Sequence, residues 1–205
     1  MSFVIYVIDC ETTGVDPILN DVIEVSLWRL KDDQQKTWQI KALNAETISD
    51  KALKINGHKR EDILLMSPGS KDTYRDPASV VSEIEVWMMQ DEATVEDRVF
   101  LGHNSKFDFD FLKELWKKAG SPDTFPFGYF LIDTIQLTKF IDLCSGKRRA
   151  RYNLGSLVKD FGVTKASAHR AEGDVKMTRD LFLKQFEPIK DFIAQTFGNS
   201  YSMER

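Results

Sequence analysis

Two acidic residues stand at the end of a short apolar run near the N-terminus. The run covers residues 3–8, and Asp9 and Glu11 follow it on either side of Cys10. Residues two apart on a strand point to the same face, so the two carboxylates are expected to project together. Paired carboxylates can hold a divalent cation or transfer a proton. Such a triplet also ends many strands in a solvated turn, and by itself it does not decide between the two interpretations.

A third acidic residue, Asp108, begins an apolar stripe in the segment 106–120. Apolar residues follow it three, four, seven and eight positions later, which places them on one side of a helix. Asp110 shares the opposite side with lysine and glutamate residues. The spacing therefore nominates Asp108, and not Asp110, as the acid directed into the protein. The alternative is an aspartate that stabilises the N-terminus of its own helix.

The same pattern recurs at Asp174, which precedes mainly apolar residues at helical spacing in the segment 172–186. An unpaired buried carboxylate costs several kcal/mol, so a counterion is expected if Asp174 is covered. The four acids come without a Cys or His cluster, and such oxygen donors suit Mg²⁺ or Mn²⁺ better than zinc. Four negative charges balance two divalent ions. Without metal these charges repel, so divalent metal is expected to stabilise the fold.

Hydrophobic periodicity predicts the elements that must position these acids. Strands are expected at 3–8, 21–30 and 37–43, with a hairpin joining the last two. Strands and helices then alternate, and the chain order indicates an α/β protein with a mixed sheet flanked by helices. The later strands are expected at 99–104 and 127–134, and the principal helices at 78–90, 106–120, 135–144, 153–162 and 172–186.

Length and composition limit the class of protein. A chain of 205 residues suits one large domain better than two small ones. Its 28 Lys and Arg and 32 Asp and Glu give a net charge of -4, which argues against coating nucleic acid through global charge. The longest apolar run, 3–8, is far shorter than the roughly 20 residues of a membrane span. The absence of a basic region before it and the presence of two cysteines, Cys10 and Cys144, favour an intracellular, cytoplasmic protein without a disulfide.

Three motifs that carry these acids resemble those of the DEDDh 3′-to-5′ exonucleases, the DnaQ-like group within the RNase H-like fold. DCETTG contains Asp9 and Glu11, HNSKFD contains Asp108, and HRAEGD contains His169 and Asp174. Their order and spacing match the family, which includes the proofreading epsilon subunit of bacterial DNA polymerase III. Lesser similarities are DPxxxxVIEV, KINGH, IDT and YNLGSL, and the resemblance runs from about residue 4 to about residue 186.

The resemblance implies an RNase H-like fold with a central mixed five-stranded sheet. Residues 1–186 would form the exonuclease domain, and residues 187–205 a C-terminal helix and tail packed on that domain. The four acids would hold two divalent metal ions, Mg²⁺ or Mn²⁺, and His169 would act as the general base. His169 and Asp174 are five residues apart, about 140° around a helix, so the histidine is expected on the loop before the helix.

The resemblance also implies substrate contacts. In similar enzymes the backbone and side chains after the acids of the first motif, here at Thr12 and Thr13, meet the terminal nucleotide, and an apolar residue, here Ile55, packs on its base. Asn104 would brace the substrate or the active-site loop. The basic segment 147–151 is either a solvated loop or a loop that binds phosphates. Its candidate phosphate contacts are Arg148, Arg149 and Arg151.

Single-stranded DNA 3′ ends are the expected substrate, with nucleoside 5′-monophosphates as products. The same motifs also serve ribonucleases that trim RNA or short oligonucleotides, because sugar contacts and not these motifs separate the two activities. A different class is a proofreading partner that acts when docked on a DNA polymerase, or a nucleic-acid-binding module without activity. All five catalytic positions are present, which favours an active enzyme, nucleoid-associated if bacterial or phage.

Overall fold

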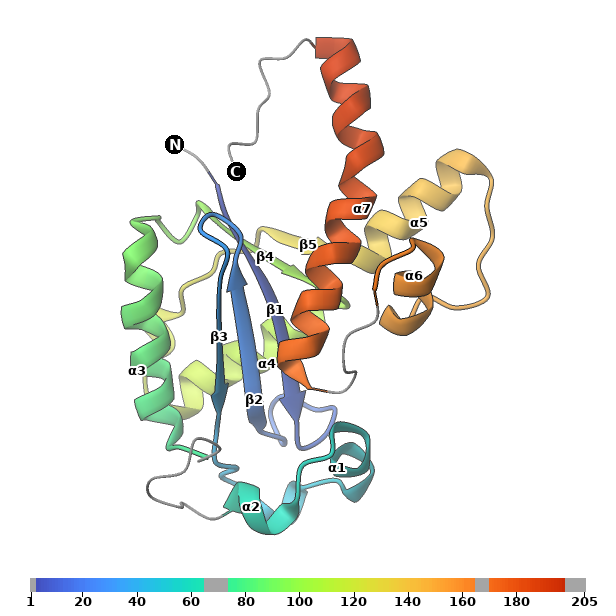
Figure 1. Cartoon of the computed structure of the whole chain (residues 1–205). Coiled ribbons are helices and arrows are strands. Elements are labelled where there is room, and N and C mark those ends of the chain that lie inside the picture. Colours follow the sequence, from blue (N-terminus) through green and yellow to red (C-terminus); the bar gives the residue numbers. More distant parts are fainter. Residues whose placement is uncertain (1–2, 65–73, 165–169, 198–205) are drawn as a thin grey trace.

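A nine-residue strand, apolar in its first five residues, forms the centre of a mixed sheet. The computed structural model describes residues 3–64, 74–164 and 170–197, the last seven as backbone only. The strand order is β3-β2-β1-β4-β5 (Figure 1). The strands are β1 (Val4–Thr12), β2 (Val22–Arg29), β3 (Gln34–Gln39), β4 (Arg98–Gly102) and β5 (Leu131–Asp133). Apolar cores lie on both faces of β1, so residues 4–8 of this strand are apolar on both sides.

The strand pairing sets which residues of β1 share a face. β1 pairs antiparallel with β2 and parallel with β4, and β2 continues into the antiparallel pair with β3. Tyr6 and Ile8 pack in the large core on one face, whereas Val7 belongs to the smaller core on the other face. Because side chains alternate along a strand, Asp9 and Glu11 continue the face of Val7.

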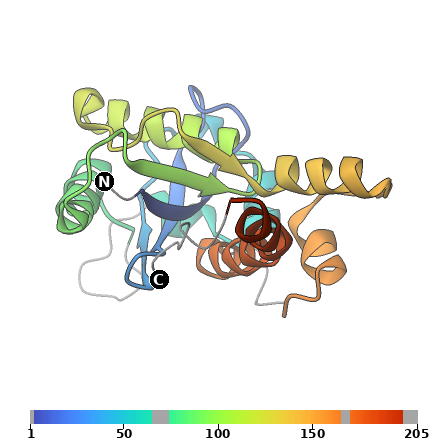
Figure 2. The same ribbon diagram turned by 90° about the horizontal axis from the view of Figure 1, so that it is seen from above.

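Helices cover the two faces of the sheet unequally. α4 lies on one face and α7 on the other (Figure 2). α3 and α4 supply apolar side chains to the larger core, and α7 supplies Val175 and Phe182 to the smaller one. The helices are α1 (Asp50–Asn56), α2 (Arg60–Leu64), α3 (Pro77–Met88), α4 (Ser105–Lys118), α5 (Thr134–Ser145), α6 (Leu154–Asp160) and α7 (Ala171–Phe197), with short 3-10 helices at Ala45–Thr47, Met89–Asp91 and Pro122–Thr124.

The predicted five-stranded mixed sheet is confirmed, but the limits of three strands and the end of one helix were wrong. The first strand continues past residue 8 to Thr12, where it still pairs with β2. The third strand covers 34–39 instead of 37–43, because the tight turn after β2 pairs Gln34 directly with Arg29. The fifth strand is limited to 131–133, where it pairs with β4. The last helix continues past its predicted end to Phe197, with Pro188 inside it.

The predicted boundary at residue 186 falls inside α7. Residues 187–197 continue the same helix, and this end projects beyond the sheet (Figure 1). Glu187, Pro188 and Lys190 are exposed, and the packing of residues 187–205 on the domain stays a prediction. Residues 198–205 lie outside the described part of the chain. Within the described residues, the structure contains no helix long and apolar enough to cross a membrane.

Candidate active site

Three of the predicted acids meet at one end of the sheet. One carboxylate oxygen each from Asp9, Glu11 and Asp174 lies within 4.8 Å of the other two. Asp9 and Glu11 come from the end of β1, and Asp174 from the first turn of α7, which covers that face (Figure 1). The predicted alignment of Asp9 with Glu11 is therefore confirmed, and α7 adds the third carboxylate.

The α7 stripe predicted from helical spacing is also confirmed. The four positions after Asp174 on this stripe are buried, and Asp174 itself is half-buried at the edge of the core. These buried positions are Met177, Thr178, Leu181 and Phe182. The apolar packing thus fixes the rotation of α7 about its axis, and this rotation aims Asp174 at the end of β1.

The cluster concentrates negative charge in a partly desolvated site. Burial raises the pKa of Asp9 well above its usual value, and the charges of Asp108, Asp174 and Glu11 raise it further. Burial also raises the pKa of Glu11 to about 8, assisted by Asp174 and Glu24, whereas Arg170 and Asn56 lower it. A divalent cation would remove this repulsion. The oxygen-only donor set fits Mg²⁺ or Mn²⁺.

Asp108 approaches the site from the opposite face of the sheet. It is buried in the first turn of α4, as its stripe predicted, and burial raises its pKa well above the usual value. Its Oδ1 accepts a hydrogen bond from the backbone N–H of Cys10 at 3.0 Å. Asp108 is not part of the three-carboxylate cluster, but its charge acts on Asp9. Its carboxylate ties α4 to the strand that carries Asp9 and Glu11.

The predicted general base, His169, lies outside the described residues, which resume at Arg170. The other two histidines, His58 and His103, contact hydroxyl groups within the protein. Nδ1 of His103 lies 2.8 Å from the hydroxyl of Thr134, and burial lowers the pKa of His103. His58 is buried with Nδ1 against the hydroxyl of Tyr74. His58 is therefore inaccessible to a phosphate of the substrate.

The two threonines that follow Glu11 are buried, so their side chains are not exposed for the predicted substrate contact. Thr13 is fully buried, and its hydroxyl accepts the N–H of Asp21 at 2.8 Å. Its carbonyl accepts the N–H of Ser49. The hydroxyl of Thr12 donates to the carbonyl of Gly14 at 2.6 Å. Both side chains hold the loop that follows β1, because its polar groups need partners once the loop is covered.

Two other predicted substrate contacts are exposed. Ile55 is 56% exposed on α1, and the next residue, Asn56, donates its side-chain N–H to the carbonyl of Thr12. Asn104 is exposed in the left-handed region at φ 70°, and its backbone N–H donates to Asp133 at 3.2 Å. An asparagine tolerates this conformation better than most residues. Both residues can reach a ligand from elements that are tied to the site.

The basic segment divides into buried and exposed arginines. The guanidinium of Arg149 is bound by the carboxylates of Asp142 and Asp160 and lies over the ring of Phe161. Because these partners occupy it, Arg149 does not fit the predicted phosphate contact. Arg148 and Arg151 are exposed. The segment is thus held in place by one arginine and presents the other two.

Sequence reasoning missed two residues that contact the candidate site. Asn56 lowers the pKa of Glu11, and Glu24 lies opposite Glu11 in β2. Glu24 is only 1% exposed although it is a carboxylate. Its sequence signal was a glutamate between valine and isoleucine residues in a strand, VIEV, which resembled an ordinary polar alternation.

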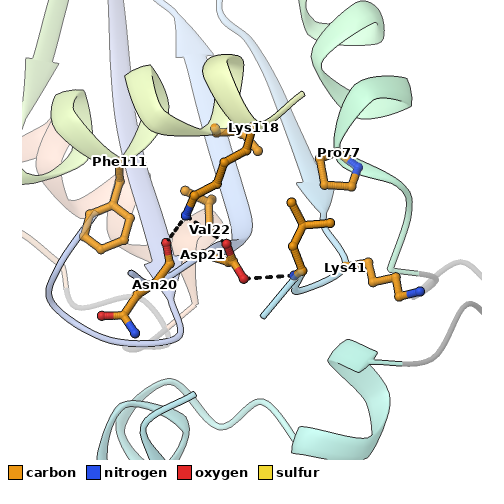
Figure 3. A pocket seen from close by; sticks show the side chains of 9 residues that line it. Asn20, Asp21, Val22, Lys41, Pro77, Phe111 and Lys118 are labelled. Carbon is orange, nitrogen blue, oxygen red and sulfur yellow. Dashed lines mark hydrogen bonds and ion pairs between the residues drawn. The ribbon is translucent and has the colours of Figure 1, made fainter. Parts of the chain in front are cut away.

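A small pocket near α3 and α4 is separate from this site (Figure 3). Lys118 reaches into it and bonds the Asn20 carbonyl at 2.6 Å and Asp21 at 2.9 Å. Asp21 also accepts the N–H of Leu43. These polar groups already satisfy one another, and the pocket contains none of the predicted site residues, so it is not a candidate catalytic site.

The fold and the carboxylate cluster define a DnaQ-like nuclease of the RNase H-like fold. A family model described as RNase_T, exonuclease, matches residues 6–182, and the chain belongs to this exonuclease family. The chain is 29% identical over 188 residues to DNA polymerase III PolC-type from Staphylococcus aureus (strain bovine RF122 / ET3-1). This match includes 90% of the chain but only 11% of the relative.

Solved structures support the fold assignment. A product-bound structure of exonuclease I has a TM-score of 0.73 at 14% identity, covering 95% of this chain and 46% of that one. Escherichia coli exonuclease I in complex with a dT13 oligonucleotide has a TM-score of 0.71 at 16% identity, covering 94% and 43%. The chain therefore spans less than half of these neighbours and about a tenth of the polymerase relative.

Proposed function

We propose that this chain is a metal-dependent 3′-to-5′ exonuclease of the DEDDh type that releases nucleoside 5′-monophosphates from single-stranded DNA. The observation that carries the proposal is the cluster of Asp9, Glu11 and Asp174 in a chain of the exonuclease family. The DNA preference is supported by its likeness to PolC-type polymerases and to exonuclease I bound to dT13. RNA 3′ ends are the alternative substrate to be tested beside DNA.

The residues of the cluster have distinct tasks in this proposal. Asp9, Glu11 and Asp174 would hold the divalent cations, with Asp108 beside Asp9. When bound, two such ions supply Lewis acidity to both the attacking and the leaving oxygen. Carboxylates bind cations when deprotonated, so binding must displace protons that the raised pKa values favour.

His169 would take the proton of the attacking water, as a general base near neutral pH. His169 directly precedes Arg170, where the described chain resumes. Helix α7, which carries Asp174, begins at the next residue, Ala171. Ile55 would pack on the terminal base and Asn104 would contact the substrate or brace its loop. Arg148 and Arg151 would bind backbone phosphates farther along the strand, because both are exposed.

A polymerase-linked activity is the second candidate. The PolC-type relative matches 90% of this chain within 11% of its own length, so that segment is part of a much longer polymerase chain. In this version the chain removes misincorporated nucleotides while docked on a DNA polymerase. The two versions differ in whether the isolated chain degrades DNA at an appreciable rate.

Digestion of 3′-labelled and 5′-labelled single-stranded DNA and RNA of matched sequence tests the proposal. With Mg²⁺ or Mn²⁺ we expect mononucleotides from the 3′ end, and no product with chelator. Asp174→Asn should abolish the activity, whereas Asp180→Asn, a change of the same type in the same helix, should retain it. Asp180 pairs with Arg179 outside the cluster. Cleavage from the 5′ end, or equal activity of the D174N variant, would contradict the proposed mechanism.

The rate ratio between DNA and RNA decides the substrate. Failure of a folded, metal-binding chain to cut either polymer would exclude a stand-alone enzyme. Repeating the assay with a replicative DNA polymerase and a primer with a mismatched 3′ end would then test the docked version. Excision that requires both proteins would support that version, and no excision would leave a binding module without catalysis.

A further inference from the structure

Glu24 is a buried carboxylate next to the catalytic cluster and outside it. It stands in β2 directly across from Glu11, so both side chains lie on the sheet face covered by α7. It is only 1% exposed. A buried carboxylate persists only when several donors satisfy its oxygens, so its partners indicate its task.

The donors around Glu24 come mainly from the start of α7. Its Oε1 accepts the backbone N–H of Ala171, the first residue of the helix, at 2.9 Å. Its Oε2 lies 3.3 Å from a guanidinium nitrogen of Arg170. Gln39 donates to the same oxygen at 3.3 Å, and Nε2 of His58 lies 3.6 Å away. A carboxylate suits this place because helix N-termini and arginines both favour negative charge.

These contacts hold the turn that carries Asp174. Asp174 is three residues after Ala171, within the same first turn of α7. A second strand contributes a tether, since Gln35 of β3 donates to the carbonyl of Glu172 at 3.0 Å. The start of α7 is thus fastened to β2, which pairs with the strand that carries Asp9 and Glu11, and to β3, the next strand beyond β2.

We propose that Glu24 is a positioning residue that fastens the first turn of α7 so that Asp174 reaches Asp9 and Glu11. Glu24 does not touch the metal or the substrate in this role. It acts through the N–H of Ala171 and through Arg170, which follows His169 in the sequence. The proposal rests on the proposed function only in taking the three-carboxylate cluster as a metal site.

Two substitutions separate geometry from charge. Glu24→Ala removes the acceptor for Ala171, whereas Glu24→Gln keeps an acceptor oxygen and removes the negative charge. Mn²⁺ binding is measured by titration calorimetry well below the melting temperature of each variant. For E24A we expect an affinity about 10- to 100-fold lower, the usual loss when a residue that orients a ligand is removed. E24Q should stay closer to the wild type than to E24A.

A second readout does not depend on metal. Amide hydrogen exchange at Ala171 and Gly173 in the metal-free protein should be faster in E24A than in the wild type, because the first turn of α7 loses its tether. Asp91→Ala is the matched control. Asp91 is also buried in an ion pair, with Arg98, and it accepts from Tyr6. D91A should lower the melting temperature while the affinity for Mn²⁺ and the exchange at Ala171 stay unchanged.

Three results would overturn the proposal. The first is wild-type Mn²⁺ affinity and wild-type amide exchange in E24A. The second is an equal loss of affinity in E24Q and E24A, since negative charge and not the tether would then explain the effect. The third is an equal loss in D91A, which would indicate general destabilisation. If the wild type itself binds no Mn²⁺, the proposed function fails, and the exchange at Ala171 still decides whether Glu24 holds α7.

Discussion

The raised pKa of Glu11 makes the stability of the protein depend on pH. Its pKa of about 8 in the folded chain, against a usual 4.5, comes from burial and then from the charges of Asp174 and Glu24. The folded state therefore holds a proton that the unfolded state releases between these two values. This contribution to stability is fully present below about pH 4.5 and is lost as the pH rises through about 8. The pKa of Asp9 is shifted in the same direction.

The first prediction concerns the pH dependence of the metal-free protein. Its melting temperature should fall between about pH 5 and pH 8, and Glu11→Gln should reduce the fall by several degrees, because glutamine stays neutral throughout. Mg²⁺ should restore the melting temperature at pH 8 in the wild type. Glu172→Gln, at an exposed position in α7, is the control. Identical pH profiles for E11Q and the wild type would show that Glu11 is not the titrating group.

In the basic segment 147–151, between α5 and α6, neighbouring arginines have different roles. The side chain of Arg149 is 6% exposed and that of its partner Asp142 is 4% exposed. Tyr152 also donates to Asp142 at 3.0 Å. This network anchors the loop, while Arg148 and Arg151 extend into solvent. A run of basic residues in the sequence gave no sign of this division.

The second prediction separates the two kinds of arginine. Arg148→Ala with Arg151→Ala should weaken binding of a single-stranded oligonucleotide and lower the slope of log K against log salt by about 1 to 1.5. The melting temperature should stay near that of the wild type. Fluorescence anisotropy at several salt concentrations checks this expectation. An unchanged salt slope would mean that neither arginine contacts a phosphate.

The third prediction is the converse for Arg149. Arg149→Ala should leave the salt slope unchanged and lower the free energy of unfolding by about 3 to 5 kcal/mol, because Asp142 remains buried without its partner. Urea unfolding measures this loss. The double variant Arg149→Met with Asp142→Leu should recover much of it, since no unpaired charge is then buried. If R149A lost more free energy of oligonucleotide binding than free energy of unfolding, Arg149 would contact the substrate, contrary to this prediction.

At the scale of the whole molecule, the two faces of the sheet meet at the site. α4 brings Asp108 from one face, α7 brings Asp174 from the other, and β1 between them carries Asp9 and Glu11. The core that supports α7 ends near Phe182 and Gln185, both buried. Beyond residue 186 the helix projects away from the sheet (Figure 1). The site therefore depends on the first half of α7.

The fourth prediction tests this dependence by truncation. A chain that ends at Phe186 should keep metal-dependent activity, and its melting temperature should change by less than about 3 °C, equivalent to roughly 1 kcal/mol for a chain of this size. Of the residues from 187 to 190, all but the half-buried Ile189 are exposed. Thermal unfolding and the digestion assay check this. A large loss of stability would support the prediction that residues 187–205 pack on the domain.

The sequence by itself determined the mixed sheet flanked by helices, the family and the inward acids. Periodicity of 2 and 3.6 residues is local, and it was sufficient to orient Asp9 with Glu11 and to select Asp108 over Asp110. Boundaries were less well predicted, because β3 begins where its turn brings it into pairing with β2. α7 continues through Pro188 although proline usually ends a helix.

Only the tertiary structure decided which polar residues are available to a ligand. Thr13 and Arg149 were predicted to contact substrate, and both are occupied by partners within the protein. Glu24 was unnoticed, and its contacts place it at the start of α7, some 147 positions away in the sequence. The physical reason is the same for all three. Hydrogen bonds and burial depend on residues that are distant in sequence, and local pattern carries no information about those neighbours.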